Sequence, residues 1–116
     1  MNILRPLNRK ELRAWLCTNA AIENEVWVLC SRAKTAVPLD NGAGEMIRYV
    51  EVVEEALCFG WIDSTVKKNP EGAGCLQRIS PRRKHSHWTE LNIQRCHRLI
   101  EQGLMTEVGI KKCHYN

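Results

Sequence analysis

The stretch from Arg78 to Trp88 holds the residue types best suited to binding an anion. It combines three arginines, a lysine, two histidines and a closing tryptophan. Pro81 fixes the backbone next to Arg82, and a guanidinium binds carboxylates and phosphates through two parallel hydrogen bonds. Ser86 is expected to cap a helix over 87–102, whose free N–H groups also attract anions. The alternative is a solvated basic loop in which Ser86 is only a helix cap.

A second candidate is the segment 59–64, where a helix is expected to end at Gly60 and to lead directly into a strand. Side chains alternate along a strand, so Trp61 and Asp63 are expected on one face. An indole beside a carboxylate can form the floor of a pocket and orient a ligand donor. The alternative is structural, with Trp61 in the core and Asp63 paired with Arg78 on the neighbouring strand.

The two segments together give six candidate ligand-binding residues: Trp61, Asp63, Arg78, Arg82, Ser86 and Trp88. In this hypothesis the tryptophans form apolar walls, the arginines bind a small anionic ligand or a protein partner, and the aspartate orients an arginine or a ligand donor. The alternative is an enzyme acting on a polar small molecule, with Asp63 as general acid or base. We favour binding because the sequence has neither a nucleophile elbow nor a phosphate-cradling glycine loop.

Metal, cofactor and thiol chemistry have little support in the sequence. His85, His87, Cys96 and His97 match no standard zinc spacing, and on a helix Cys96 and His97 would lie about 100° apart around the axis. We therefore predict no metal site and no cofactor. The chain has six cysteines but no C-x-x-C pair and no export signal, so we expect free thiols rather than a disulfide framework.

Length and composition are those of one globular domain over 1–116, with no apolar run of the roughly 18 residues that a membrane span needs. The N-terminus lacks the features of a signal peptide, so we expect a cytoplasmic protein. The net charge of +4 and the aromatic fraction of 6% are low for a nucleic-acid-binding protein, and an acidic segment precedes the basic one. Nucleic-acid binding is therefore disfavoured.

Hydrophobic periodicity predicts an α+β fold. Helices are expected over 8–19, 48–58 and 87–102, with a short one after Thr106, and strands over 25–30, 61–66 and 75–79. The last two strands are separated by an Asn-Pro-Glu-Gly turn and are expected to form a hairpin. This order gives a small, mainly antiparallel sheet of about three strands, with about four helices packed against one face. In the second helix Glu51, Glu54 and Glu55 are expected to point outward.

The segment from Val53 to Ser64 closely resembles the signature of the YdeI/OmpD-associated family, also labelled bacteriocin-protection proteins. Further matches follow in chain order: Gln77-Arg78, Ser80-Pro81-Arg82, Ser86-x-Trp88-Thr89, Asn92, Arg95, Leu99-Ile100 and Gly103-x-Met105-Thr106. The resemblance covers most of the chain. It implies a stress-related protein that protects against bacteriocins or antimicrobial peptides, brings no catalytic mechanism, and places a site at the same six residues.

The chain also departs from that family pattern. Its stretch 83–89 is more basic and lacks the usual glycine, and Arg48 stands where a helix-capping Thr or Ser is typical. Related chains usually continue for some tens of residues beyond the position of Asn116. We therefore expect either a short member or a truncated form, in which part of a pocket wall or an oligomer contact would be missing. The sequence names neither the ligand nor the oligomeric state.

Overall fold

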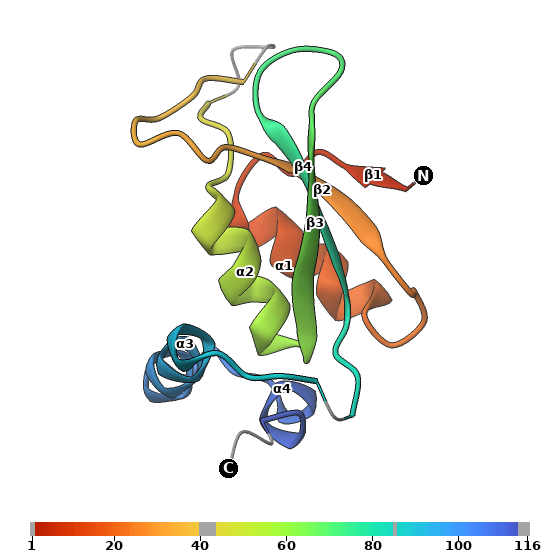
Figure 1. Cartoon of the computed structure of the whole chain (residues 1–116), viewed down its shortest axis with the longest axis vertical. Coiled ribbons are helices and arrows are strands. Elements are labelled where there is room, and N and C mark those ends of the chain that lie inside the picture. Colours follow the sequence, from red (N-terminus) through yellow and green to blue (C-terminus); the bar gives the residue numbers. More distant parts are fainter. Residues whose placement is uncertain (1, 40–43, 85, 114–116) are drawn as a thin grey trace.

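The computed structural model describes residues 2–39, 44–84 and 86–113, and it confirms the predicted α+β class (Figure 1). Its elements in chain order are β1 (Ile3–Leu4), α1 (Arg9–Asn19), β2 (Val26–Cys30), α2 (Tyr49–Cys58), β3 (Trp61–Lys68), β4 (Cys75–Pro81), α3 (Glu90–Glu101) and α4 (Glu107–Lys111). The described residues thus form four helices and a four-stranded sheet. The strand that the sequence did not predict is β1, which is only two residues long.

The sheet has the strand order β1-β2-β4-β3, in which β1 runs parallel to β2 and the other pairs are antiparallel. The predicted hairpin between β3 and β4 is confirmed, and its register runs from Trp61 opposite Pro81 to Lys68 opposite Cys75. The register shifts between Asp63 and Val66. Both hairpin strands extend two residues beyond their predicted ends, because the pairing continues past the apolar residues on which the prediction relied.

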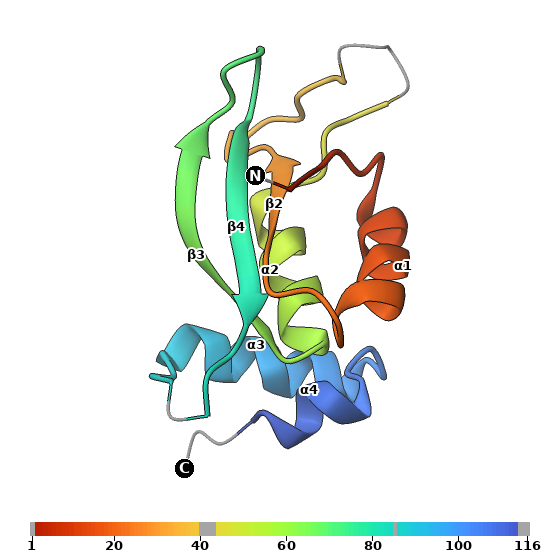
Figure 2. The ribbon, with the colours of Figure 1, turned by 90° about the vertical axis from the view of Figure 1, so that its right-hand side faces the viewer.

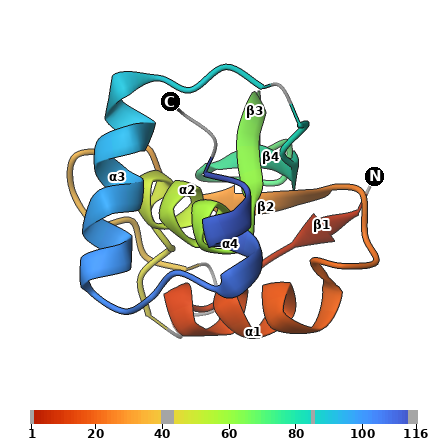
Figure 3. The same cartoon turned by 90° about the horizontal axis from the view of Figure 1, so that it is seen from below.

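α1 and α2 lie on one side of the sheet, whereas α3 and α4 lie below the lower end of the strands (Figure 2). Alternation along β2 directs Val28 and Cys30 into the core with the helices, whereas Trp27 and Leu29 join a smaller cluster on the opposite face. Seen from below, α2 lies between the sheet and the other helices, and it contacts α1, α3 and α4 (Figure 3). No helix within the described parts of the chain is long and apolar enough to cross a lipid bilayer.

The prediction that Glu54 and Glu55 point outward is wrong. Both are buried, with exposed fractions of 8% and 1%. Their carboxylates accept hydrogen bonds from arginines on α1 and α3: Arg9, Arg13 and Arg98. The apolar pattern located the face of α2 that packs on the sheet, but it did not reveal that α1 and α3 cover the part of α2 that carries these two glutamates. The ion pairs with these arginines compensate the charges of the two glutamates that α1 and α3 bury.

Helix α3 begins three residues later than predicted. Its N-cap is Thr89, whose side chain accepts from the amide of Asn92, so Ser86 is not the cap. The predicted end is confirmed, since Gly103 takes a φ of 72° beyond the last turn. The predicted short helix is also confirmed as α4, which Thr106 caps. The Thr106 amide donates to the carbonyl of Cys58, and this bond joins the start of α4 to the end of α2.

Candidate functional site

A polar hollow of about 450 Å³ lies along the hairpin of β3 and β4. We call it the serine–arginine hollow, and the described residues that line it are Asn24, Ile62, Ser64, Arg78, Ser80, Pro81, Arg83 and Ser86. Strand alternation places Ser64, Arg78 and Ser80 on the face of the hairpin that points away from the helices. Two guanidinium groups and three hydroxyls therefore surround one concave surface, which is a donor set suited to a carboxylate or a phosphate.

Arg78 is held in place by two side chains. Its Nη1 donates to the hydroxyl of Ser64 at 3.2 Å, and its Nη2 donates to the carboxylate of Glu25 at 3.1 Å. The pair between Asp63 and Arg78, which belonged to the structural alternative, does not form, because the residue opposite Asp63 is Ile79 and Arg78 points to the other face of the sheet. The hydrogen bond from Arg78, together with one from the indole of Trp27, lowers the pKa of Glu25.

Arg82 lies behind the wall of the hollow and is only 2% exposed. Its guanidinium stacks on the ring of Trp88, 3.7 Å from the centroid, and its Nη1 donates to the hydroxyl of Ser86 at 2.8 Å and to the carbonyl of His87 at 3.2 Å. Arg82 thereby orients Ser86, which lines the hollow. The predicted convergence of Arg82, Ser86 and Trp88 is present, although its basis is this stacking and not a helix start.

The remaining donors of Arg82 are unusual. Its Nε and Nη2 atoms are buried and have no hydrogen-bond partner among the described residues, and no described carboxylate pairs with it. Burial lowers the pKa of Arg82, while Cys96, Cys113 and Asp63 act in the opposite direction. Most buried polar groups in proteins have a partner, so these two donors of Arg82 are exceptions, as are Arg9 Nη2 and Gln77 Oε1 elsewhere among the described residues.

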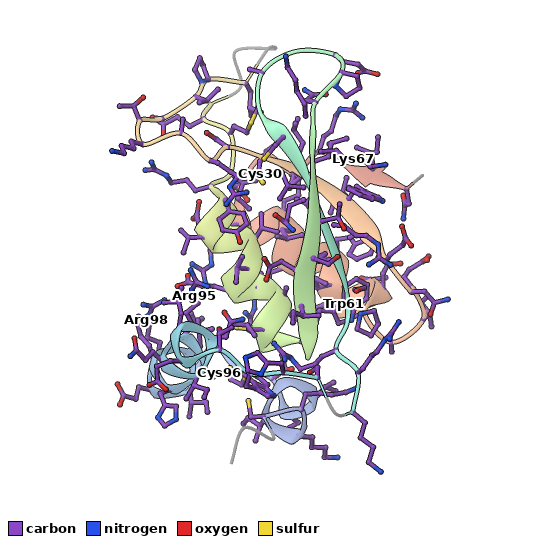
Figure 4. All side chains as sticks on the ribbon, viewed as in Figure 1. Cys30, Trp61, Lys67, Arg95, Cys96 and Arg98 are labelled. Carbon is purple, nitrogen blue, oxygen red and sulfur yellow. The ribbon has the colours of Figure 1, made fainter. Side chains whose placement is uncertain are left out.

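Trp61 and Asp63 lie on the helix-facing side, outside the serine–arginine hollow. Trp61 is 1% exposed, donates to the carbonyl of Ala20 at 3.2 Å and meets Trp15 edge-on, so it occupies the core (Figure 4). Asp63 accepts a hydrogen bond of 2.9 Å from the hydroxyl of Tyr49. Burial, followed by this hydrogen bond, raises the pKa of Tyr49.

The six candidate residues therefore fall into three groups. Arg78 and Ser86 line the hollow, Arg82 and Trp88 support Ser86 from behind, and the two residues at the start of β3 lie on the other face. Six of the eight described lining residues were not among the candidates, namely Ile62, Pro81 and the four polar residues Asn24, Ser64, Ser80 and Arg83. The predicted hairpin held a signal for two of them. Side chains alternate along each strand, so Ser64 points away from the face of Trp61 and Asp63, and Ser80 points to the same face as Arg78.

A family model covers residues 4–112 of the chain. The chain belongs to the domain of unknown function family DUF8412. This family carries no activity in its description, and the match gives no named family, so the resemblance to YdeI/OmpD-associated proteins stays a prediction. No curated protein and no solved structure matches the chain.

Of the four possible metal ligands in the sequence, His85 lies outside the described residues. Within the ranges that the structure describes, no group of three or more His, Cys, Asp or Glu side chains could hold a metal ion. Cys96 is buried in the core cluster, whereas His97 is exposed on α3. The two side chains therefore point in different directions, as their helical spacing predicted.

Proposed function

We propose that this domain binds a small anionic ligand, through its carboxylate or phosphate group, in the serine–arginine hollow. The observation that carries the proposal is the convergence of Arg78 and Arg83 with the hydroxyls of Ser64, Ser80 and Ser86 on one hollow of about 450 Å³. Small-molecule sites have volumes of roughly 300–1,000 Å³, and a concave site of this size favours a small ligand over a flat protein surface.

The charges around the hollow support an anion. Arg83 is exposed and forms no ion pair with the described residues, so its guanidinium is available to a ligand. Arg78 is already oriented by Ser64 and Glu25, which reduces the entropy that ligand binding would cost. Arg82 adds a buried positive charge that forms no salt bridge with a described carboxylate, although the charge of Asp63 acts on it from a distance. Charge-assisted hydrogen bonds to two guanidiniums are the strongest interactions that this set of side chains offers.

The biological role rests on the resemblance described above, not on the hollow. A cytoplasmic, stress-related protein that protects against bacteriocins or antimicrobial peptides would use such a site to sense or sequester its ligand. The enzyme alternative depended on Asp63, which lies on the opposite face from the hollow and is bonded to Tyr49. Binding without catalysis is therefore our preferred function.

Titration of the isotope-labelled protein with inorganic phosphate and with malonate tests this proposal. We expect saturable chemical-shift changes at the backbone amides of Ser80, Arg83 and Ser86. Arg78→Gln and Arg83→Gln should each weaken binding about tenfold, because each removes a charge-assisted hydrogen bond. Arg5→Gln is the matched control, since Arg5 is an exposed arginine that pairs with Glu71 elsewhere on the surface.

Two results would overturn the proposal. One is the absence of saturable shifts with both anions while circular dichroism shows an intact fold. The other is an equal loss of affinity in Arg5→Gln, because that would mean that only the overall charge attracts the anion.

Arg82→Met provides a separate readout: it preserves much of the packing on Trp88, removes the buried charge and leaves Ser86 without its donor. We expect this variant to bind two- to fivefold more weakly than the unmodified protein.

A further inference from the structure

We infer that Cys30 and Cys75 are a thiol pair that forms a reversible intramolecular disulfide by exchange with a small-molecule disulfide. The two cysteines lie at the opposite end of the sheet from Trp61, near the position where Figure 4 labels Cys30. The inference depends on the pairing of β2 with β4 and is independent of the proposed anion site. Either proposal can therefore fail without the other.

The strand register places the two thiols face to face. Cys30 is the last residue of β2, Cys75 is the first of β4, and they are direct partners in the antiparallel ladder. Partners of this kind have Cα atoms about 4.5–5.5 Å apart, within the range of roughly 4.4–6.8 Å that a disulfide bridges. Their sulfur atoms are 3.8 Å apart. Rotation about the Cα–Cβ bonds, with little movement of the backbone, would bring them to bonding distance.

The two thiols differ in access to solvent, and this sets the order of the reaction. Cys30 is fully buried, and burial followed by the neighbouring Cys75 raises its pKa well above the usual range. Cys75 is only partly buried, so it meets the oxidant first. Its thiolate attacks one sulfur of the small disulfide, and the first small thiolate leaves and takes up a proton.

The second step closes the bond. Cys30 releases its proton to solvent and attacks the Cys75 sulfur of the mixed disulfide, and the second small thiol leaves. In total two protein thiols are oxidised to one disulfide, while the small disulfide is reduced to two thiols. Burial keeps the Cys30 thiol away from the small disulfide in solution. Cys30 therefore reacts with the neighbouring mixed disulfide on Cys75 and not with the small molecule itself.

The other cysteines provide internal comparisons. Cys17 is exposed on α1, and Cys58 is buried at the end of α2. Cys96 and Cys113 contact each other, but they come from α3 and from the segment after α4, where no strand pairing fixes their separation. The ladder position makes Cys30 and Cys75 the pair whose backbone already satisfies the geometry of a disulfide.

Incubation of the folded chain with glutathione disulfide, followed by alkylation and mass spectrometry, tests the inference. We expect two alkylated thiols fewer than the six in the sequence, a peptide cross-linked through Cys30 and Cys75, and full reversal by dithiothreitol. Because the bond would close a long loop, the oxidised form should also melt at least about 5 °C higher. Cys17→Ser should still form the cross-link, whereas Cys75→Ser should lose it.

Cys75→Ser is the principal variant because this side chain is only partly buried, so the protein should still fold, and circular dichroism would check that it does. The inference is overturned if the unmodified protein accumulates only mixed disulfides with glutathione, without a cross-link. It is equally overturned if the first cross-link joins Cys96 and Cys113, or if Cys75→Ser loses the same two thiols as the unmodified protein.

Discussion

Arg13 of α1 donates a hydrogen bond of 3.0 Å to Glu55 of α2, whose carboxylate is 1% exposed. Arg9 donates to the other oxygen of the same carboxylate, so Glu55 lies between two guanidinium groups. Arg13 also donates to the carbonyl of Leu104 and stacks over Phe59, which extends this contact to the segment before α4. The network joins elements that are far apart in the sequence, with Glu55 at its centre.

Glu55→Gln should lower the free energy of unfolding by about 3 kcal/mol, because it removes the charge that compensates two partly buried arginines. Urea denaturation at pH 7 measures the change. Glu71→Gln is the control: it breaks the exposed pair with Arg5 and should change stability by less than about 1 kcal/mol. Equal effects of the two substitutions would show that the Glu55 network does not hold α1 against α2.

Gly109→Ala should destabilise the protein by about 1–3 kcal/mol through overpacking. A Cβ at this position would collide with the carbonyl oxygen of Cys58 and would lie 2.5 Å from the sulfur of Met105, so α4 would have to move away from α2. In amide hydrogen exchange, the Gly109→Ala variant should exchange faster than the unmodified protein in α4, with a smaller change in the sheet.

Gly103→Ala separates crowding from backbone strain in the same region. Gly103 has a φ of 72°, but a Cβ added there would meet no atom within 4 Å, so this variant should lose only about 1–2 kcal/mol through strain. Hydrogen exchange in α4 should stay close to that of the unmodified protein. If Gly109→Ala instead raised the exchange rates equally in all elements, the close contact between Gly109 and the end of α2 would not be what holds α4 in place.

The Glu25 carboxyl should titrate below its usual pKa of 4.5, because Arg78 and the indole of Trp27 stabilise its charged form. Since the folded-state pKa is the lower one, the contribution of this group to stability is present above pH 4.5 and is lost as the pH falls through the folded-state pKa. Carbon-detected NMR measures the midpoint. In Arg78→Gln the midpoint should move back toward 4.5, and an unchanged midpoint would refute the role of Arg78.

Glu25→Gln should strengthen anion binding in the serine–arginine hollow about two- to fivefold. It leaves Arg78 without its carboxylate partner and removes a negative charge at 3.1 Å from the guanidinium. The same phosphate titration measures this effect. Glu107→Gln, on the exposed start of α4, is the matched control and should leave the affinity unchanged. Weaker binding in Glu25→Gln would mean that Glu25 is needed to orient Arg78.

The Tyr49 hydroxyl should ionise above its usual pKa of 10, because burial and the adjacent Asp63 both favour the neutral phenol. The raised folded-state pKa means that the contribution to stability is present below pH 10 and is lost as the pH rises through the folded-state value. NMR of labelled tyrosine rings follows the titration. Asp63→Asn should lower the midpoint toward 10, and the absence of such a shift would contradict the hydrogen bond between these side chains.

The predicted elements depended on signals that are local in the chain. The Asn8 cap, the apolar spacing in α2 and the turn between β3 and β4 each use neighbouring residues, and the structure confirms all three. The predicted start of α3 was wrong because two capping residues compete there. Thr89 is the cap, since the hydroxyl of Ser86 accepts a hydrogen bond from Arg82 instead. β1 has two residues and forms only by pairing with β2, so local propensity did not indicate it.

The candidate site was harder to predict because its residues are assembled by pairing. A pair between Asp63 and Arg78 was one of the two alternatives, but the strand register places Ile79 opposite Asp63, so the two charged side chains point to opposite faces. The burial of Glu55 depends on how α1 crosses α2, which no local pattern encodes. The cluster of Arg82, Ser86 and Trp88 was predictable because a short turn brings together residues that are close in the chain. That Nε and Nη2 of Arg82 have no hydrogen-bond partner among the described residues could be recognised only from the folded packing.

The strand order also has a consequence for behaviour at high concentration. The two outermost strands are β1, which is too short to template another strand, and β3, which is exposed over most of its length. Figure 4 labels Lys67 on this outer strand, Lys68 follows it, and the register shift lies earlier in the same strand. Like charges and an irregular backbone oppose the joining of two sheets through their open edges. We therefore expect little aggregation through pairing of the sheet edges.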